Sequence, residues 1–130
     1  GYLGSIGFGY PAAMGAWAAA PERTIVAVTG DGGFGQYLGE LTTAVKYGMN
    51  ITHVILNDEE LGKISKEQRS GEWDVWQTSL SNPSFAAYAE ICGALGIEVR
   101  DRAALDGALA EAFAHPGPSL VEVRTDSALL

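Results

Sequence analysis

Two apolar segments of this chain each have the composition of a buried strand, and a single helix-length segment separates them. Residues 24–29 (TIVAVT) and 51–56 (ITHVIL) are rich in the β-branched residues that suit strands. Residues 36–47 between them carry apolar side chains at helical spacing, at Leu38, Leu41, Ala44 and Val45. A helix of this length rises about 18 Å, close to the roughly 20 Å of each strand. The pattern therefore predicts a right-handed strand-helix-strand crossover with two parallel strands.

The remainder of the chain continues this alternation. The expected elements are a helix over 12–20 with Pro11 in its first turn, a helix capped by Asn82 that starts at Pro83 and ends at Gly96, a strand over 97–100, a helix over 102–114 and a strand over 119–124. Such alternation is typical of an α/β domain whose mostly parallel sheet is covered by helices on both faces. We predict one such domain over residues 1–130.

Polar turns follow the first two expected strands. The run GDGG at 30–33 ends the first strand, and the pair Asn57-Asp58 ends the second. Because neighbouring parallel strands lie about 4.8 Å apart and end at the same rim, we expect Asp31 and Asp58 to share one crevice. Ligands of open α/β sheets bind at that rim. The two turns are therefore the candidate functional site.

The glycine-rich turn at 30–35 (GDGGFG) allows three interpretations. A hairpin turn is disfavoured, because the segment that follows has helical rather than strand periodicity. A dinucleotide site is the second interpretation, because the turn matches GxGxxG after a strand and before a helix. In that case, however, Asp31 would face a pyrophosphate, and like charges repel each other in a water-poor pocket.

A metal-diphosphate site is the third interpretation and the one that we favour. A divalent cation between Asp31 and a diphosphate would make the carboxylate a ligand, and Mg2+ prefers hard oxygen donors of this kind. Gly32 and Gly33 would let backbone N–H groups approach the phosphate, helped by the positive end of the following helix. A dinucleotide site for NAD stays open as the alternative.

The two turns together resemble the signature of thiamine diphosphate (ThDP) enzymes, in which GDG precedes an Asn-Asn-like pair. The resemblance implies that the side chains of Asp31 and Asp58 bind Mg2+ and that Glu60 offers its backbone carbonyl. Asn57 is implied to shape the turn. Asp58 stands where the family commonly has asparagine, and its extra negative charge should tighten metal binding while repelling the diphosphate.

A second stretch carries the same resemblance. Residues 4–13 (GSIGFGYPAA) are similar to the GSxGxGxPAA segment that lies ahead of GDG in these enzymes. The resemblance places Gly4, Ser5 and Ile6 at the cofactor. The Gly4 carbonyl would accept a hydrogen bond from the aminopyrimidine, and the Ile6 side chain would wedge between the two rings. A glycine-rich entry into a helix is the structural alternative for this stretch.

Residues 59–81 interrupt the alternation with a polar, charged stretch. Leu61 and Gly62 lie closest to the expected metal turn and are candidates for contact with the cofactor. We expect the charged residues after them to form a solvated helix. Trp73 and Trp76 are expected to pack against a domain outside this chain.

The family's enzymes contain several domains, and the resemblance covers only the pyrophosphate-binding one. It implies that residues 1–130 form an N-terminally incomplete domain. The glutamate that activates the pyrimidine is implied to lie in another domain, usually from a partner subunit, so no catalytic residue is assigned here. We expect the chain alone to lack turnover, as a fragment or as one subunit of a split enzyme. The complete protein is expected to be a homodimer or homotetramer.

One branch of the family, that of pyruvate oxidase and quinone-linked pyruvate dehydrogenase, resembles this chain most. The similar segments are NDEELGKISKEQ, NPSFAAYAEICGALGIEV and GPSLVEV. The resemblance implies a 2-oxo acid substrate such as pyruvate, with FAD as an optional cofactor of the full-length enzyme. Acetolactate synthases share much of the same frame, so a carboligase is an alternative, as is a non-catalytic module that binds Mg2+ and phosphate.

Composition excludes several other functions. Sixteen acidic and eight basic residues give a net charge of −8. Without a basic cluster, we expect no binding to nucleic acid. No apolar run approaches the roughly 20 residues that span a bilayer, and no signal peptide is evident, so a cytoplasmic protein is expected. The single cysteine, Cys92, is expected in the core. His53 and His115 are expected to be structural.

Overall fold

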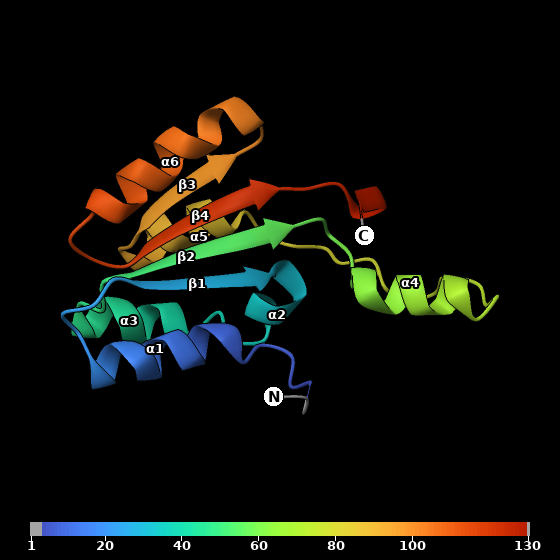
Figure 1. Ribbon diagram of the computed structural model, residues 1–130, viewed down its shortest axis with the longest axis horizontal. Helices are drawn as coiled ribbons and strands as arrows, with labels where there is room; N and C mark the ends of the chain where they lie inside the picture. Colours follow the sequence, from blue (N-terminus) through green and yellow to red (C-terminus); the bar gives the residue numbers. More distant parts are fainter. Residues whose placement is uncertain (1–3, 130) are drawn as a thin grey trace.

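A four-stranded parallel sheet forms the centre of the computed structural model, which describes residues 4–129 (Figure 1). Residues 1–3 and 130 of the expected domain lie outside the described residues. The strands, in the spatial order β1-β2-β4-β3, are β1 (Ile25–Gly30), β2 (Ile51–Asn57), β4 (Ser119–Arg124) and β3 (Leu95–Val99). All neighbouring pairs are parallel. The four carboxyl ends therefore share one rim, as the crossover pattern predicted.

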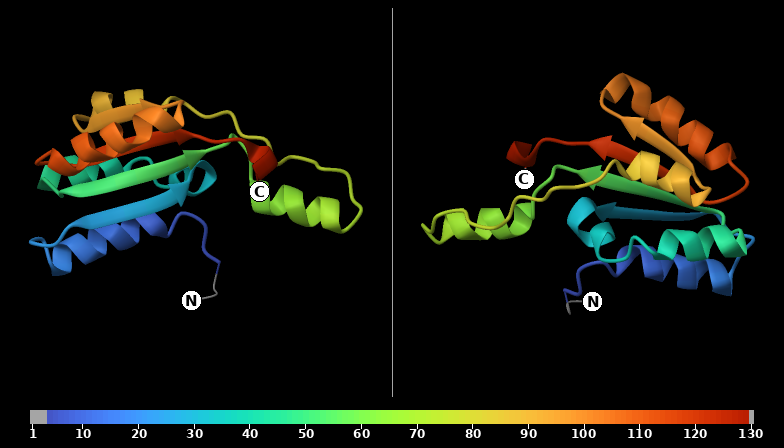
Figure 2. Two further views of the ribbon diagram at one scale, coloured as in Figure 1. Left: turned by 45° about the horizontal axis from the view of Figure 1, so that its top comes forward. Right: turned by 180° about the vertical axis from the view of Figure 1, so that it is seen from behind.

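Helices cover both faces of this sheet (Figures 1 and 2). They are α1 (Gly9–Ala19), α2 (Asp31–Gly35), α3 (Glu40–Tyr47), α4 (Gly62–Ser70), α5 (Phe85–Cys92), α6 (Arg102–Ala114) and the short 3-10 helix η1 (Ser127–Leu129). Helices α1, α3 and α5 pack on one face, and α6 packs on the other. The predicted α/β class is confirmed. The bounds predicted for α6 and β4 agree with the structure.

Alternating side chains of the central strands divide the core into two layers. Ile51, Ile55 and Leu120 are fully buried beneath α1, α3 and α5. Val54 and Val121 point the other way, toward α6. Each fully buried aliphatic side chain contributes roughly 1.5–3 kcal/mol, so burial of both layers holds the strand ends in register.

The face that α6 covers is only partly protected. Helix α6 lies over β3 and β4, and Val26 and Val28 of the edge strand β1 are 45% and 63% exposed.

None of the helices within residues 4–129 combines the length and the hydropathy that a membrane-spanning helix needs.

The helix predicted over residues 36–47 is wrong in its start and its continuity. Helix α2 begins at Asp31, directly after β1, and four turn residues separate it from α3. In this turn the Tyr37 N–H donates to the Phe34 carbonyl and the Glu40 N–H donates to the Tyr37 carbonyl. Each hydrogen bond spans three residues, rather than the four of an α-helix. The glycines in this segment have low helix propensity, which favours these tighter turns over one continuous helix.

The helix predicted to end at Gly96 ends four residues earlier, at Cys92. Gly93 follows in the left-handed conformation with φ 89°, which is a common end of a helix. The next strand, β3, begins at Leu95 rather than at residue 97. Gly96 lies inside that strand, where only glycine fits, because a Cβ at this position would lie 2.0 Å from the Ala86 carbonyl oxygen.

The predicted cap of this helix is also wrong. Ser84, not Asn82, caps α5, because the Ser84 hydroxyl accepts a 3.2 Å hydrogen bond from the Ala87 N–H. Asn82 is free of that role and turns toward the rim of the sheet, where it donates to two other side chains.

Residues 59–80 form an arm that projects beyond the carboxyl ends of the strands (Figures 1 and 2). It contains α4 and a returning strand-like segment. The N–H of Leu61 donates to Thr78 and that of Leu80 donates to Glu59, each at 2.7 Å. The expected solvated helix is confirmed, since most of α4 is exposed. Trp73 and Trp76 are 72% and 71% exposed, and their packing against another domain stays a prediction.

Candidate functional site

Asp31 is a buried carboxylate at the point where β1 becomes α2. Its side chain is 3% exposed. Oδ1 accepts a hydrogen bond from the Gly32 N–H at 2.8 Å. Oδ2 accepts two, from the Glu59 N–H at 3.0 Å and from the Asn82 amide at 2.6 Å. Among the described residues, no cation pairs with this carboxylate.

Burial raises the pKa of Asp31 above its ordinary value, and the charge of Asp58 raises it further. Hydrogen bonds from Gly32, Asn82 and Glu59 lower the pKa and oppose this effect. A divalent cation at the carboxylate would favour its ionised form by direct attraction.

The second polar turn is fixed by its own side chains. Asn57 is 1% exposed, and its side-chain Oδ1 accepts from the N–H of Glu59 at 3.3 Å. Asp58 Oδ1 accepts from the N–H of Glu60 at 3.2 Å. Glu59 adopts the left-handed conformation with φ 58°, which is strained for a residue with a side chain. That geometry turns the chain so that the Glu59 N–H reaches Asp31.

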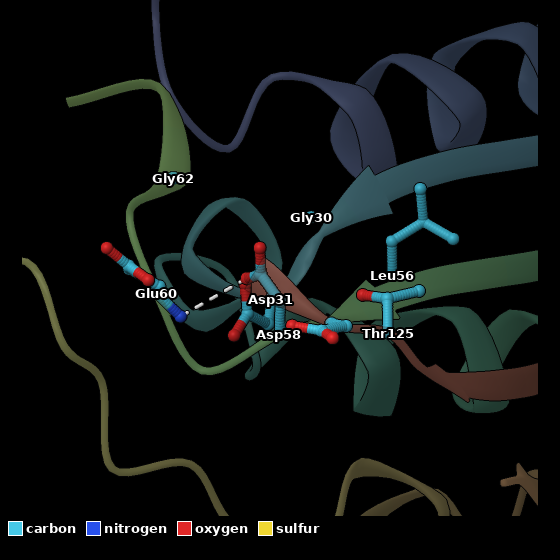
Figure 3. Close-up of a pocket in the computed structure, with 8 residues that line it drawn as sticks. Gly30, Asp31, Leu56, Asp58, Glu60, Gly62 and Thr125 are labelled. Carbon is cyan, nitrogen blue, oxygen red and sulfur yellow. Dashed lines mark hydrogen bonds between the residues drawn. The ribbon is translucent and has the colours of Figure 1, made fainter. Parts of the chain in front are cut away.

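Asp31 and Asp58 line one cavity of about 330 Å³, as the shared rim predicted (Figure 3). The strands bring them together because Gly30 pairs with Leu56 across β1 and β2. The lining residues are Gly30, Asp31, Leu56, Asp58, Glu60, Gly62, Thr125 and Asp126.

The Glu60 side chain points away from the two aspartates (Figure 3). Its carboxylate lies 3.5 Å from the Arg69 guanidinium. The Glu60 side chain is thus engaged outside the site, and the carbonyl role that the resemblance implies for its backbone stays a prediction.

Asp31 and Asp58 are two carboxylates that this cavity could offer to a metal ion. Among the described residues, no group of three or more His, Cys, Asp or Glu side chains is arranged to hold a metal ion. Mg2+ commonly uses one or two carboxylates and completes its shell with phosphate oxygens and water. Asp31 and Asp58 match the number of carboxylates in that pattern, and the binding of Mg2+ itself stays a prediction.

Neighbouring residues approach the glycine turn closely at Gly32 and at ordinary contact distance at Gly33. A side chain at Gly32 would place its Cβ 2.7 Å from Leu61 Cδ2. A Cβ at Gly33 would lie 3.7 Å from the backbone nitrogen of Gly7. Leu61 and Gly62 thus both adjoin the site, one against Gly32 and the other in the cavity wall.

The N-terminal candidates lie beside the glycine turn but outside the cavity wall. Gly4 has a positive φ of 59°. The Ser5 carbonyl accepts from the Phe8 N–H at 3.4 Å. Ile6 is 52% exposed. The close approach of Gly7 to Gly33 connects this segment to the turn that carries Asp31.

Sequence reasoning missed three residues at this rim. Asn82 contacts Asp31 directly, and Thr125 and Asp126 complete the cavity wall. The signal for the last two was available, because they follow a predicted parallel strand whose carboxyl end must share the rim. Asn82 carried no such signal, since Asn-Pro before an apolar segment is typical of a helix start.

A family model described as "Thiamine pyrophosphate enzyme, C-terminal TPP binding domain" matches residues 1–123. The chain belongs to this family. Thiamine pyrophosphate and ThDP are two names for the same cofactor. The resemblance predicted from the two glycine-containing segments is therefore confirmed, and a ThDP-binding domain is favoured over a dinucleotide-binding one. The metal ion stays a prediction.

Individual relatives agree with this assignment. The mitochondrial acetolactate synthase catalytic subunit of Saccharomyces cerevisiae is 39% identical over 127 residues, which cover 97% of this chain and 18% of the relative. A Bacillus subtilis protein provisionally named thiamine pyrophosphate-containing protein YdaP is 46% identical over 123 residues, covering 94% of this chain and 21% of the relative.

A solved structure shows the same fold. The thiamine diphosphate-dependent 4-hydroxybenzoylformate decarboxylase of Rhodococcus jostii RHA1 superposes with a TM-score of 0.86 at 30% identity. The superposition covers 93% of this chain and 23% of that chain. This domain of the ThDP enzyme family thus spans about a fifth of the length of the relatives that it matches.

Proposed function

We propose that the protein containing this domain binds ThDP together with Mg2+ and uses them to decarboxylate a 2-oxo acid, with pyruvate as the first candidate. The observation that carries the proposal is the position of Asp31. A buried carboxylate with no cationic partner among the described residues faces a second aspartate across a cavity, in a chain of the ThDP family.

The charged end of the cofactor is the part that this domain would hold. Asp31 and Asp58 would bind Mg2+ through their side chains and Glu60 through its backbone carbonyl. Gly32 and Gly33 would let the diphosphate approach the backbone closely, because glycine has no side chain to cover it. The Gly33 N–H would be the one offered, since that of Gly32 already donates to Asp31. Charge neutralisation by the metal would offset repulsion between the diphosphate and the two aspartates.

The ring end of the cofactor would lie along the N-terminal segment and the arm. Ile6, half exposed in this structure, is available to wedge between the two rings. The Gly4 carbonyl would accept the aminopyrimidine hydrogen bond, with Ser5 beside it. Leu61 and Gly62 would contact the cofactor from the start of the arm. When bound, ThDP supplies a carbon nucleophile and an electron sink for decarboxylation.

The fate of the decarboxylated substrate separates two candidate activities. The sequence segments favour the pyruvate oxidase and quinone-linked pyruvate dehydrogenase branch, in which FAD would accept electrons. The names of several relatives, including the yeast and Haemophilus influenzae proteins, favour an acetolactate synthase-type carboligase. Both activities start from pyruvate.

Catalysis would need residues beyond this domain. The activating glutamate is proposed to come from another domain, usually of a partner subunit, in a homodimer or homotetramer. We therefore expect no turnover from residues 1–130 alone. Decarboxylation of pyruvate by the isolated domain would contradict this part of the proposal.

The full-length protein should be reconstituted with ThDP and Mg2+ and offered a panel of 2-oxo acids, with and without FAD. Release of CO2 from pyruvate is the expected result. Transfer of electrons from pyruvate to an acceptor only when FAD is present would identify the oxidase branch. Formation of acetolactate without net oxidation would identify the carboligase. Calorimetric binding of NAD without metal, and no binding of ThDP with Mg2+, would contradict the proposal.

A further inference from the structure

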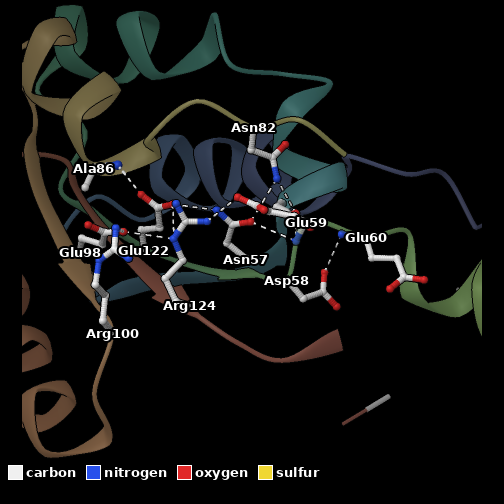
Figure 4. Close-up of polar contacts among 11 residues, drawn as sticks. Asn57, Asp58, Glu59, Glu60, Asn82, Ala86, Glu98, Arg100, Glu122 and Arg124 are labelled. Carbon is white, nitrogen blue, oxygen red and sulfur yellow. Dashed lines mark hydrogen bonds and ion pairs between the residues drawn. The ribbon is translucent and has the colours of Figure 1, made fainter. Parts of the chain in front are cut away.

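A continuous series of hydrogen bonds crosses the rim of the sheet from Glu122 of β4 through Asn57 to Asn82 (Figure 4), and Asn82 extends it to Asp31. Asn57 donates its amide to Glu122 at 2.7 Å. The same side chain accepts, through its Oδ1, from the Asn82 amide at 3.1 Å. Asn82 also donates to Asp31 Oδ2 at 2.6 Å. These hydrogen bonds therefore link Asp31, the candidate metal ligand after β1, to Glu122 in β4, two strands away.

The direction of every bond in this chain is determined by its two ends. Glu122 and Asp31 are carboxylates, which when ionised can only accept hydrogen bonds. The amide nitrogen of Asn57 must therefore face Glu122, which leaves its oxygen toward Asn82. Asn82 must then present its nitrogen to both neighbours. Chemistry, rather than an arbitrary choice of amide orientation, fixes both asparagines.

The far end of the chain is rigid. The Glu122 side chain is fully buried, and its Oε2 accepts from the Ala86 N–H at 3.0 Å in the first turn of α5. Its Oε1 lies 3.5 Å from the Nε atom of Arg124. Helix α5 packs in the main core layer, so Glu122 connects the polar chain to a fixed element.

The near end of the chain constrains which oxygen of Asp31 can bind a ligand. Each carboxylate oxygen can accept about two hydrogen bonds. Oδ2 already accepts two, from Asn82 and from the Glu59 N–H. Oδ1 accepts only one, from the Gly32 N–H. Oδ1 is therefore the oxygen with capacity for a metal.

We propose that Asn82 is a positioning residue for the metal-binding carboxylate. It holds Oδ2 of Asp31 so that Oδ1 faces the metal, and Asn57 and Glu122 hold Asn82 in the required orientation. The inference rests on the proposed function, because it requires Asp31 to bind Mg2+. It goes further by assigning a role to a side chain outside the ligand set and by naming the metal-facing oxygen.

The experiment uses the full-length protein and measures metal-dependent ThDP binding rather than turnover. The concentration of Mg2+ that half-saturates ThDP binding should rise about tenfold in Asn82→Ala, as is usual when a residue that orients a metal ligand is removed. The matched control is Ser81→Ala, an exposed neighbour that should bind as wild type does. Asp31→Ala should abolish metal-dependent binding and serves as the reference for complete loss.

A comparison of two metals separates positioning from general stability. Mg2+ requires near-octahedral geometry, whereas Ca2+ tolerates irregular ligand positions. Loss of orientation should therefore raise the Mg2+ half-saturation value by a larger factor than the Ca2+ value. A merely structural role would change both values by the same factor. Thermal unfolding of the metal-free variant reports folding directly, and Asn82→Leu, which is similar in size but has no donor, replaces Asn82→Ala if that variant does not fold.

The outcomes distinguish the two proposals. If the wild-type protein binds ThDP with Mg2+ and Asn82→Ala, or Asn82→Leu in its place, binds equally well, the positioning role is overturned and the proposed function stands. Equal factors for Mg2+ and Ca2+ would also overturn it. If the wild-type protein shows no metal-dependent ThDP binding, the proposed function fails, and the positioning role fails with it.

Discussion

The Nε2 atom of His53 lies 2.8 Å from the Thr29 hydroxyl oxygen, and this hydrogen bond joins β2 to β1 just before the turn that carries Asp31. The ring is fully buried and stacks on Tyr10 with centroids 4.6 Å apart. Burial lowers the pKa of His53 to about 3. The imidazole is therefore neutral in the folded protein throughout the physiological range, in agreement with the structural role that was predicted.

Folding should become less favourable in mild acid because of this histidine. Below about pH 6.5 the unfolded chain gains a proton at His53 that the folded protein does not bind. The free energy of unfolding should thus fall by about 1.4 kcal/mol per pH unit from this group, from pH 6.5 down toward pH 3. His53→Phe should remove that part of the slope in chemical denaturation series. Thr29→Val keeps the imidazole buried and should retain it; an unchanged slope in His53→Phe would refute the account.

Glu122→Gln should destabilise the protein although it changes little in shape. Glu122 accepts hydrogen bonds from Asn57 and from the Ala86 N–H, and glutamine would turn an N–H2 group toward one of these donors. A buried donor left unpaired costs about 1–3 kcal/mol. Denaturant unfolding measures this loss. Glu111→Gln, on the exposed side of α6, is the matched control and should change the unfolding free energy by less than about 0.5 kcal/mol.

Two glycine-to-alanine substitutions should have opposite effects. At Gly96 the new Cβ would meet the Ala86 carbonyl oxygen within 2.0 Å, so β3 and α5 must separate, at about 1–3 kcal/mol or more. At Gly107, exposed within α6, nothing lies within 4 Å of the new Cβ. Alanine there should stabilise the helix by about 0.5–1 kcal/mol. Thermal melts of both variants test the packing of α5 on the sheet, and a tolerated Gly96→Ala would show that this packing is wrong.

Asp58→Asn should separate metal affinity from cofactor affinity. The charge of Asp58 raises the pKa of Asp31, and it would also repel the diphosphate. Its removal should weaken binding of Mg2+ but tighten binding of ThDP at saturating Mg2+, each by about 1 kcal/mol, or roughly fivefold. Calorimetry of the full-length protein measures both. A change of the two affinities in the same direction would argue against opposing roles for this charge.

The sequence pattern was sufficient to predict the parallel sheet and the rim at which the candidate site lies. Periodicity identified the strands because β-branched residues gather in runs bounded by polar turns, and parallel pairing follows from the helix-length connections. The same logic brought Asp31 and Asp58 to one cavity. Boundaries were less accurate where glycines decide them, since Gly93 and Gly96 both suit a helix end and only packing on Ala86 distinguishes them.

The hydrogen-bond chain behind Asp31 was not predictable from the sequence. Asn82 lies 51 residues after Asp31, and the approach of the two side chains depends on the return path of the arm. Ser84 supplies the cap that Asn82 would otherwise provide, and a single sequence contains no signal for that exchange. Glu122 looked like an ordinary alternating residue of a strand, yet it is fully buried.

The central claim is that Asp31 anchors ThDP through a metal ion. Binding of ThDP to the full-length protein, measured by calorimetry with Mg2+ and with a chelator, tests it most directly in wild type, Asp31→Ala and the exposed control Asp106→Ala. Wild type and control should bind ThDP only with Mg2+, and Asp31→Ala should bind at least about 100-fold more weakly, as expected for loss of a metal ligand. Binding that persists with the chelator, or that is unaffected by Asp31→Ala, would contradict the claim.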